Sequence, residues 1–486
     1  MRAALLWWMA WPAVAAGLGG RIESLLVSSE AGRLAFWGIR VADAATAETL
    51  FEKNADHLFV PASNVKLFTT ALALVKLGPE FRFETRVLAE TAPDPSGRLR
   101  GDLRLVGGGD PSLSGRDYPY RKGPVTGDPL RGLEELADEI VARGIRVVDG
   151  DIVGDDSLYP WEPYPEGWTQ GDALWDYGAP VSALTLNDNM MWLTLHPGAK
   201  PGWPAVVSLR PAVEYYVVHN HTVTRERAED RVAIARLPGT RELRIWGEIG
   251  LRDPERTFEL AVDDPARYAA AALADALLRR GVVIRGVPRA QHRPDSVATA
   301  GSAFFELARR SSPPLAEMLK VVNKESQNLH AELLLRAVGR ACRGSATRRA
   351  GLEEMQAWLK QAGVASDAVR LEDGSGLSRR NLATPRAIAQ LLVYMYNGGY
   401  RAAWLESLPV GGEDGTLEHR FEGAAEGRRI RAKTGTLARA SALAGYAATP
   451  SGRLLAFAIL VNHHAAPTSE VRRLIDRISI VIAQGG

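Results

Sequence analysis

Strand-like segments at both ends of the chain constrain the fold more than any other feature. Residues 34–41 and 48–52 flank a short Ala/Thr turn and are typical of a hairpin. Three more strand-like segments lie near the other end, at residues 429–433, 441–447 and 454–462. The apolar spacing of residues 468–483 predicts a helix after them. We therefore expect one antiparallel sheet that is built from both chain ends and covered by helices.

The middle of this 486-residue chain has a β-rich pattern of its own. Short strand-like runs occur at close spacing, at residues 103–106, 147–153, 206–209, 215–218, 232–237 and 243–249. Helical patterns cover residues 130–143 and 266–279. We predict an α+β protein with one or two β-rich domains inserted over residues 85–300. Residues 21–84 plus 301–486 would form the main domain.

The first residues are typical of an export signal. Arg2 gives a short positive region, residues 3–14 are apolar, and Ala13-Val14-Ala15 supplies small residues for cleavage. We expect residues 1–15 to be a signal peptide and the mature protein to be periplasmic or otherwise exported. An uncleaved anchor is the alternative, and a peripheral membrane contact is compatible with both.

Composition excludes several classes of protein. The formal net charge of +2 argues against nucleic acid as a partner. Cys342 is the single cysteine, so no intramolecular disulfide can form. The His219-Asn220-His221 and His463-His464 pairs lack the acidic or cysteine companions of a zinc site, and we expect neither a metal nor a cofactor.

A Ser-x-x-Lys motif, Ser63 to Lys66, stands where an apolar helix over residues 65–77 is predicted to begin. Residues three apart lie on one helix face, so Lys66 can accept a proton from Ser63. Backbone N–H groups at the helix start can also donate to an oxyanion. A base near neutral pH needs a lysine pKa of about 7 rather than about 10.4, which burial beside a second cation, with Lys433 as the candidate, would supply. Taken alone, the motif also fits a capping serine with an exposed lysine.

Two further motifs follow in order. Ser326-Gln327-Asn328 lies between helical runs at 314–322 and 329–340; its hydroxyl can relay a proton and its amide can hold a carbonyl. Lys433-Thr434-Gly435 ends a predicted strand, and Gly435 would let a substrate backbone pair with that edge. The side chains of Lys433, Thr434 and Thr436 suit a substrate carboxylate. Taken alone, the two motifs also fit a helix cap and a β-turn.

With these motifs in this order, the chain resembles the class C low-molecular-mass penicillin-binding proteins, which are D-alanyl-D-alanine carboxypeptidase/endopeptidases with SxxK, SxN and KTG motifs. The 263 residues from Ser63 to Ser326 match the large insertion of that family. The resemblance extends through residues 108–112, 323–326, 373–378 and 415–417 and covers nearly the whole mature chain.

The resemblance implies a set of roles. Ser63 would be the acylated nucleophile, Lys66 its base, and Ser326 with Lys433 the group that passes a proton to the departing D-alanine. The residues that would bind substrate are Asn328, Thr434, Gly435 and Thr436, and the backbone N–H groups of Ser63 and Thr436 would bind the oxyanion. Asp155, with Asp156 adjacent to it, would meet the distal amine of a diaminopimelate side chain. Gln327 departs from the aspartate usual in the family, and we expect its side chain to point away from substrate.

We therefore expect an exported serine D,D-peptidase that acts on peptidoglycan stem peptides and cross-links and is acylated by β-lactams. A β-lactamase-like hydrolase is one alternative, distinguished by fast deacylation. A non-catalytic peptidoglycan-binding scaffold is the other, and the presence of every catalytic residue type argues against it.

Overall fold

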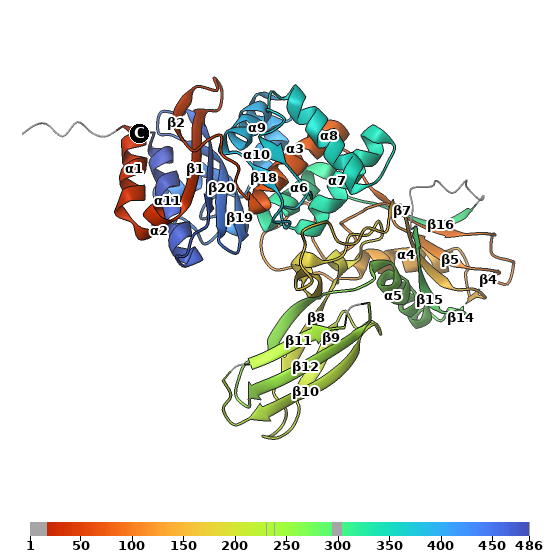
Figure 1. Cartoon of the computed structure of the whole chain (residues 1–486). Coiled ribbons are helices and arrows are strands. Elements are labelled where there is room, and N and C mark those ends of the chain that lie inside the picture. The colour runs from red at the N-terminus through yellow and green to blue at the C-terminus, as the bar shows by residue number, and fades with distance from the viewer. Residues whose placement is uncertain (1–16, 230, 238, 294–303, 486) are drawn as a thin grey trace, which may run out of the picture.

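The computed structural model of the protein describes residues 17–229, 231–237, 239–293 and 304–485 (Figure 1). The predicted signal peptide and its cleavage site at Ala15 lie outside these residues. None of the helices within them is long and apolar enough to cross a membrane.

The main domain is built on a five-stranded antiparallel sheet with the strand order β19-β20-β21-β1-β2. Its strands are β1 (Phe36–Asp43), β2 (Thr49–Lys53), β19 (Ile430–Leu437), β20 (Ala440–Ala448) and β21 (Leu454–Asn462). The two chain ends meet where β1 pairs with β21, with Ile39 opposite Ile459. This confirms the predicted sheet built from both ends of the chain.

Side-chain alternation along the strands gives the sheet two buried faces. One face packs against α1 (Leu18–Ser28), α2 (Glu30–Leu34) and α11 (Thr468–Gln484), with Leu443 and Phe457 among its core residues. The opposite face is lined by small residues of β20 and β21, namely Ala442, Ala444, Ala456 and Ala458. Small side chains let helices lie close to that face, and the catalytic motifs stand there.

The helical layer surrounds α3 (Val65–Leu77), which is buried from Val65 to Leu74 and therefore needs no polar face. Around it lie α6 (Leu315–Lys320), α7 (Asn328–Arg343), α8 (Arg348–Gln361), α9 (Pro385–Asn397) and α10 (Arg401–Ser407). Helices α3, α7 and α11 match the predicted ones, whereas α8, α9 and α10 were not predicted.

Over the residues that the structure describes, the inserted region contains four sheets. Its five-stranded sheet has the order β15-β7-β5-β3-β16, formed by β3 (Glu84–Ala89), β5 (Leu103–Val106), β7 (Ile152–Pro160), β15 (Pro288–Arg293) and β16 (Phe305–Ser311). A small sheet joins β4 (Arg98–Leu99), β6 (Val147–Val148) and β14 (Val283–Ile284). Helices α4 (Arg131–Ala142) and α5 (Pro265–Arg279) share one core with these strands.

Two three-stranded sheets project away from the main domain (Figure 1). One consists of β8 (Met190–His196), β9 (Val206–Arg210) and β13 (Arg256–Ala261), and the other of β10 (Val217–Arg225), β11 (Arg231–Arg236) and β12 (Glu242–Gly250). Where the insertion joins the main domain, β3 pairs with β16, so that both of its connections leave side by side. The domain boundaries at residues 85 and 300 remain predictions, and the sheet itself runs on to Ser311.

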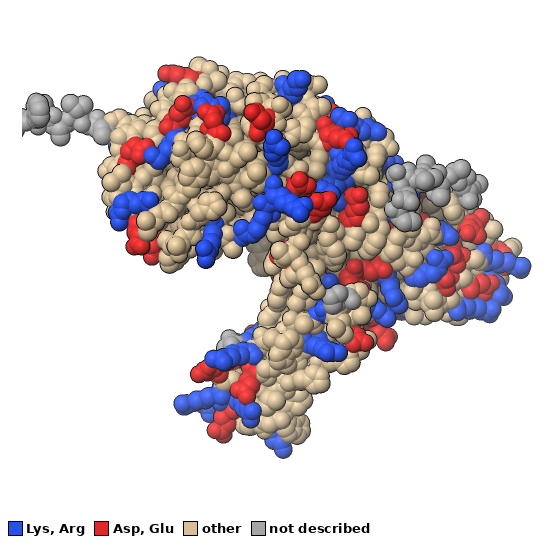
Figure 2. Space-filling view, in the orientation of Figure 1, with Lys and Arg blue, Asp and Glu red and all other residues tan. Residues whose placement is uncertain are grey.

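Charged side chains of both signs are interspersed over the face of the molecule in Figure 2. This distribution agrees with the small net charge of the chain.

Candidate active site

A short 3-10 turn, Ala62–Asn64, carries Ser63 directly before α3. The side chain of Asn64 is buried, and its Nδ2 donates to the backbone oxygen of Lys433 at 2.8 Å. This bond fastens the serine turn to strand β19. Two of the three predicted motifs, far apart in sequence, are thereby held together.

Lys66 is completely buried, and its Nζ lies within hydrogen-bonding distance of three oxygen atoms. These are Ser63 Oγ at 3.0 Å, Asn328 Oδ1 at 2.5 Å and the backbone oxygen of Ser375 at 2.5 Å. Burial lowers the pKa of Lys66 to about 7, although the negative charges of Asp373 and Glu332 act in the opposite direction.

The partners of Lys66 decide where its lone pair points. A neutral amine has two N–H bonds and one lone pair, and the Asn328 and Ser375 oxygens can only accept. If the two N–H bonds serve these two oxygens, the lone pair is directed at the hydroxyl of Ser63. The geometry therefore equips Lys66 to take the Ser63 proton.

The loop of residues 373–378 supplies the Ser375 carbonyl and is held by buried carboxylates. Glu332 Oε1 accepts from the backbone N–H groups of Gly374 at 2.8 Å and Ser375 at 2.9 Å, while Glu332 Oε2 pairs with Arg336 at 3.2 Å. Asp373 accepts from the backbone of the same loop. Sequence reasoning missed Glu332, whose signal was a charged residue inside an apolar helical run.

Ser326 follows a single π-turn, Val321–Glu325, and adopts a left-handed backbone conformation with φ of 65°. Its Oγ accepts from Lys433 Nζ at 2.8 Å, and Lys433 Nζ also donates to the backbone oxygen of Thr434 at 3.0 Å. Burial lowers the pKa of Lys433 well below its usual value, and the charge of Lys66 lowers it further. Burial, rather than a second cation, is thus the leading cause of the low pKa at both lysines.

Gly435 packs against the serine turn, and its pairing with a substrate backbone stays a prediction. A Cβ atom at this position would lie 2.7 Å from the Pro61 oxygen and 3.2 Å from the Ser63 nitrogen. A contact of 2.7 Å essentially never occurs at a real Cβ atom, so only glycine lets β19 lie against the serine turn. The close approach is made by the protein's own backbone.

Ser63 opens into a cavity of about 590 Å³. Ser326, Asn328 and Thr436 also line it, together with Gly167, Thr169, Asp172, Tyr177, Gly376, Leu377, Arg379, Leu437 and Ala438. Nearby, Thr434 Oγ1 donates to Thr416 Oγ1 at 2.8 Å, and Arg472 donates to Thr436 Oγ1 at 3.1 Å. Residues of the first two motifs, together with Thr436 directly after the third, therefore meet around one space.

The structure does not bring Asp155 to this cavity. Asp155 lies on β7, where its Oδ1 accepts from the Ser157 backbone at 3.0 Å and its Oδ2 lies 4.0 Å from Arg104. The one carboxylate among the described residues of the cavity wall belongs to Asp172. Sequence reasoning missed Asp172 because it stands in an irregular segment between strands, where neither periodicity nor a motif marks it.

An ion network in the inserted region braces the Ser326 motif. Burial alone would raise the pKa of Asp188, but Arg116 and His330 hold it below its usual range. Arg116 Nη2 lies 2.6 Å and His330 Nε2 lies 2.8 Å from this carboxylate, and Arg116 also pairs with Glu325. Glu325 directly precedes Ser326, so the insertion helps to position the motif. Gln327 Oε1 accepts from the Leu329 backbone at 2.8 Å and caps α7.

In the part of the chain that the structure describes, no group of three or more His, Cys, Asp or Glu residues is placed to hold a metal ion.

Comparison with known proteins finds relatives over nearly the whole chain. The family model described as the D-Ala-D-Ala carboxypeptidase 3 (S13) family matches residues 20–480. A D-alanyl-D-alanine carboxypeptidase of Actinomadura sp. is 35% identical over 474 residues, which is 94% of this chain and 84% of the relative. The D-alanyl-D-alanine carboxypeptidase DacB of Haemophilus influenzae is 25% identical over 428 residues, 86% of this chain and 83% of the relative.

A solved structure also matches over nearly the full length. The crystal structure of penicillin-binding protein 4 from Haemophilus influenzae superposes with a TM-score of 0.81 at 23% identity, covering 96% of this chain and 98% of that one. This similarity concerns the fold.

Proposed function

Because this chain belongs to the D-Ala-D-Ala carboxypeptidase 3 (S13) family, we propose that its serine-type carboxypeptidase activity proceeds through an acyl-enzyme on Ser63. The observation that carries the proposal is the 3.0 Å contact between Ser63 Oγ and a buried Lys66 whose pKa is lowered to about 7. A lysine in this state is a competent general base at neutral pH.

In the first step, Ser63 Oγ attacks the carbonyl carbon of the penultimate D-alanine, and its proton passes to Lys66 Nζ. The C–N bond then breaks, and the departing amine takes a proton from the Ser326 hydroxyl, which Lys433 holds by a hydrogen bond. The proton that Lys66 accepted from Ser63 makes up for the one that Ser326 gives away, so both lysines end the step in their starting states. Water hydrolyses the Ser63 ester in the second step and frees the enzyme.

The oxyanion of the tetrahedral intermediate is stabilised by the backbone N–H groups of Ser63 and Thr436. Gly435 supports this role because its missing side chain allows the serine turn to lie against β19. One donor of this type is worth about 10²–10³ in rate.

Substrate contacts follow from the lining of the cavity. Thr436, which lines the cavity, and Thr434, two residues before it, bind the terminal carboxylate of the peptide. Asn328 and Asp172 line the same cavity: Asn328 orients the peptide backbone, and Asp172 takes the place expected for Asp155 and receives the distal amine of the stem-peptide side chain. Peptidoglycan stem peptides offer these groups. A cross-link differs only in its larger leaving group, so the same centre would cleave D-alanyl cross-links. A peptidoglycan substrate accords with export directed by residues 1–15.

Mass spectrometry of the intact protein after penicillin treatment tests the mechanism. We expect one penicilloyl adduct per chain, located on Ser63 by peptide mapping and lasting long enough to isolate. Ser63→Ala should form no adduct and release no D-alanine, while Ser451→Ala, at an exposed serine in the turn between β20 and β21, should behave as wild type. D-Alanine release by Ser63→Ala at the wild-type rate would refute the acyl-enzyme. Rapid turnover of penicillin would instead indicate a β-lactamase.

A further inference from the structure

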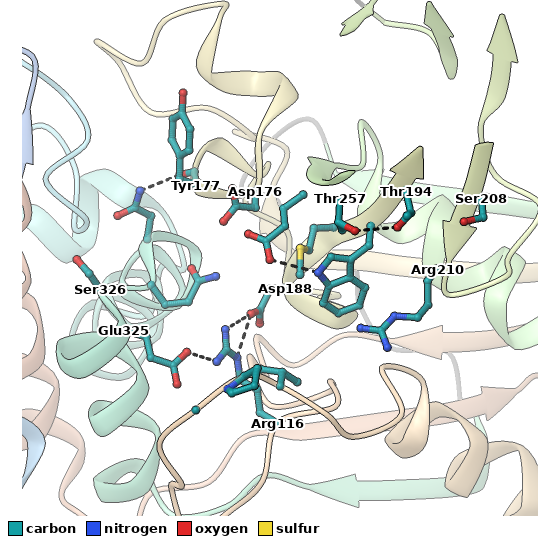
Figure 3. Close-up of a pocket in the computed structure, with 18 of the residues that line it drawn as sticks. Arg116, Asp176, Tyr177, Asp188, Thr194, Ser208, Arg210, Thr257, Glu325 and Ser326 are labelled. Carbon is teal, nitrogen blue, oxygen red and sulfur yellow. Dashed lines mark hydrogen bonds and ion pairs between the residues drawn. The ribbon is translucent and has the colours of Figure 1, made fainter. Parts of the chain in front are cut away.

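A second cavity, of about 800 Å³, adjoins the Ser63 cavity (Figure 3). Tyr177, Ser326 and Asn328 line both cavities. Asn328 Nδ2 donates to the backbone oxygen of Tyr177 at 2.8 Å. The second cavity therefore begins at Ser326, the proposed donor to the leaving amine. A departing D-alanine would fill only a small part of this volume, so its size is suited to a larger group on the leaving side.

The far wall of this cavity is one face of the sheet formed by β8, β9 and β13. Alternation along β8 directs every second residue toward the core, and Met191, Leu193 and Leu195 are fully buried. The residues between them face the cavity, together with their neighbours on the other two strands: Trp192, Thr194, His196, Ser208, Arg210, Thr257 and Glu259. In Figure 3, Thr194, Ser208, Arg210 and Thr257 lie together across the cavity from Ser326.

These side chains form ordered rows across the strands. Trp192 is paired with Arg210 on one side and Glu259 on the other, and the row two residues farther along consists of Ser208, Thr194 and Thr257. Successive rows of this kind lie about 7 Å apart.

The first row is locked in place. The Arg210 guanidinium lies 4.3 Å from the centroid of the Trp192 ring, and the indole Nε1 donates to Glu259 Oε1 at 3.2 Å. In the second row, the hydroxyls of Thr194 and Thr257 lie 3.0 Å apart. An indole held from two sides loses little conformational entropy when a ligand packs against it.

Two of the carboxylates that line this cavity, Asp176 and Glu259, lie near Trp192 and each other. Burial and the nearby charge of Glu259 raise the pKa of Asp176 to about 6. Both Asp176 and Glu259 line the cavity, and the indole of Trp192 donates to only one of the two Glu259 oxygens, Oε1. Carboxylates in this position are stabilised by hydrogen-bond donors from a ligand.

We propose that this face is a saccharide-binding subsite, which holds the sugars attached to the leaving side of a peptidoglycan substrate. A pyranose ring has an apolar C–H face that packs on an indole and a rim of hydroxyls that donate to carboxylates and exchange hydrogen bonds with Thr and Ser hydroxyls. Trp192 provides the platform, Asp176 and Glu259 the acceptors, and Thr194 and Thr257 the hydroxyls. A peptide that binds by adding a strand would use a free sheet edge instead of a sheet face.

This inference rests on the proposed function and is tested with two substrates that differ only in sugar. One is a cross-linked muropeptide dimer with the GlcNAc–MurNAc disaccharide on the leaving stem peptide, and the other is the same dimer after enzymatic removal of that disaccharide. The measurement is the ratio of kcat/KM for the two dimers. We expect the wild type to prefer the sugar-bearing dimer about tenfold, as one stacked ring with its hydrogen bonds would supply.

Trp192→Ala should bring this ratio close to one, and Trp192→Phe, which keeps a ring but lacks the indole nitrogen, should give an intermediate ratio. Trp246→Ala is the matched control, because Trp246 is an exposed tryptophan on β12 outside the cavity, and it should keep the wild-type ratio. A wild-type ratio of one, or a ratio that Trp192→Ala leaves unchanged, overturns the subsite. D-Alanine release from a sugar-free pentapeptide is assayed in parallel. If the wild-type enzyme released no D-alanine from this peptide, the result would instead count against the proposed function.

Discussion

Replacing Asn328 by aspartate tests whether a neutral Lys66 is the base. Asn328 Oδ1 lies 2.5 Å from Lys66 Nζ, so Asn328→Asp puts a negative charge against the amine with little change in shape. An opposite charge within about 4–6 Å shifts a pKa by roughly 1–3 units, and here it favours the protonated lysine. The pKa of Lys66 should therefore rise from about 7 to roughly 8–10.

The expected loss follows from the fraction of neutral lysine. With a pKa of about 7, roughly half of the Lys66 side chains are neutral at pH 7; after a rise of 1–3 units, the fraction falls to roughly 10% to 0.1%. The second-order rate of acylation by a fluorescent penicillin should fall about 5- to 500-fold at pH 7. The acylation rate should recover as the pH is raised, because Lys66 becomes neutral again above its new pKa.

The pH profile separates this effect from the loss of a substrate contact. Asn328→Leu removes the amide without adding a charge, so its acylation rate should be lower at every pH while the inflection stays at or below about 7. The reasoning is refuted if Asn328→Asp keeps the wild-type inflection. A rate that fails to rise between pH 7 and 10, with the protein still folded by thermal melting, would refute it equally.

Two further predictions concern the walls of the Ser63 cavity. Gly435→Ala should lower the acylation rate at least tenfold, because the new Cβ would lie 2.7 Å from the Pro61 oxygen and displace the serine turn. The control is Gly399→Ala, since nothing lies within 4 Å of a Cβ at that position. Equal acylation rates for the two variants would contradict the packing argument. Asp172→Asn should raise KM for a stem peptide with a free side-chain amine by about tenfold, yet leave a peptide with an acetylated amine unaffected, since only the former offers a charge to the carboxylate. Equal effects on both peptides would argue against Asp172 as the amine-binding residue.

Local sequence patterns determined the catalytic residue types and the main elements around them. The serine before an apolar helix and the lysine one turn later follow from helical periodicity, which is a local property. The five strands of the main sheet were predicted for the same reason, because runs of β-type residues form a local pattern. The order of the three motifs identified the family before any contact was known.

Tertiary structure alone decided which groups surround these residues. The backbone oxygen of Ser375, the carboxylate of Glu332 and the lining residue Asp172 come from segments distant from the motifs, and no spacing rule places them. The sequence marked Gly435 as special, but only the structure shows that the serine turn of the same chain packs against it. The pKa of Lys66 likewise depends on how completely the folded chain excludes water from the amine. Solvent exclusion is a property of the whole packed domain, whereas the sequence specifies only which side chains are there to be packed.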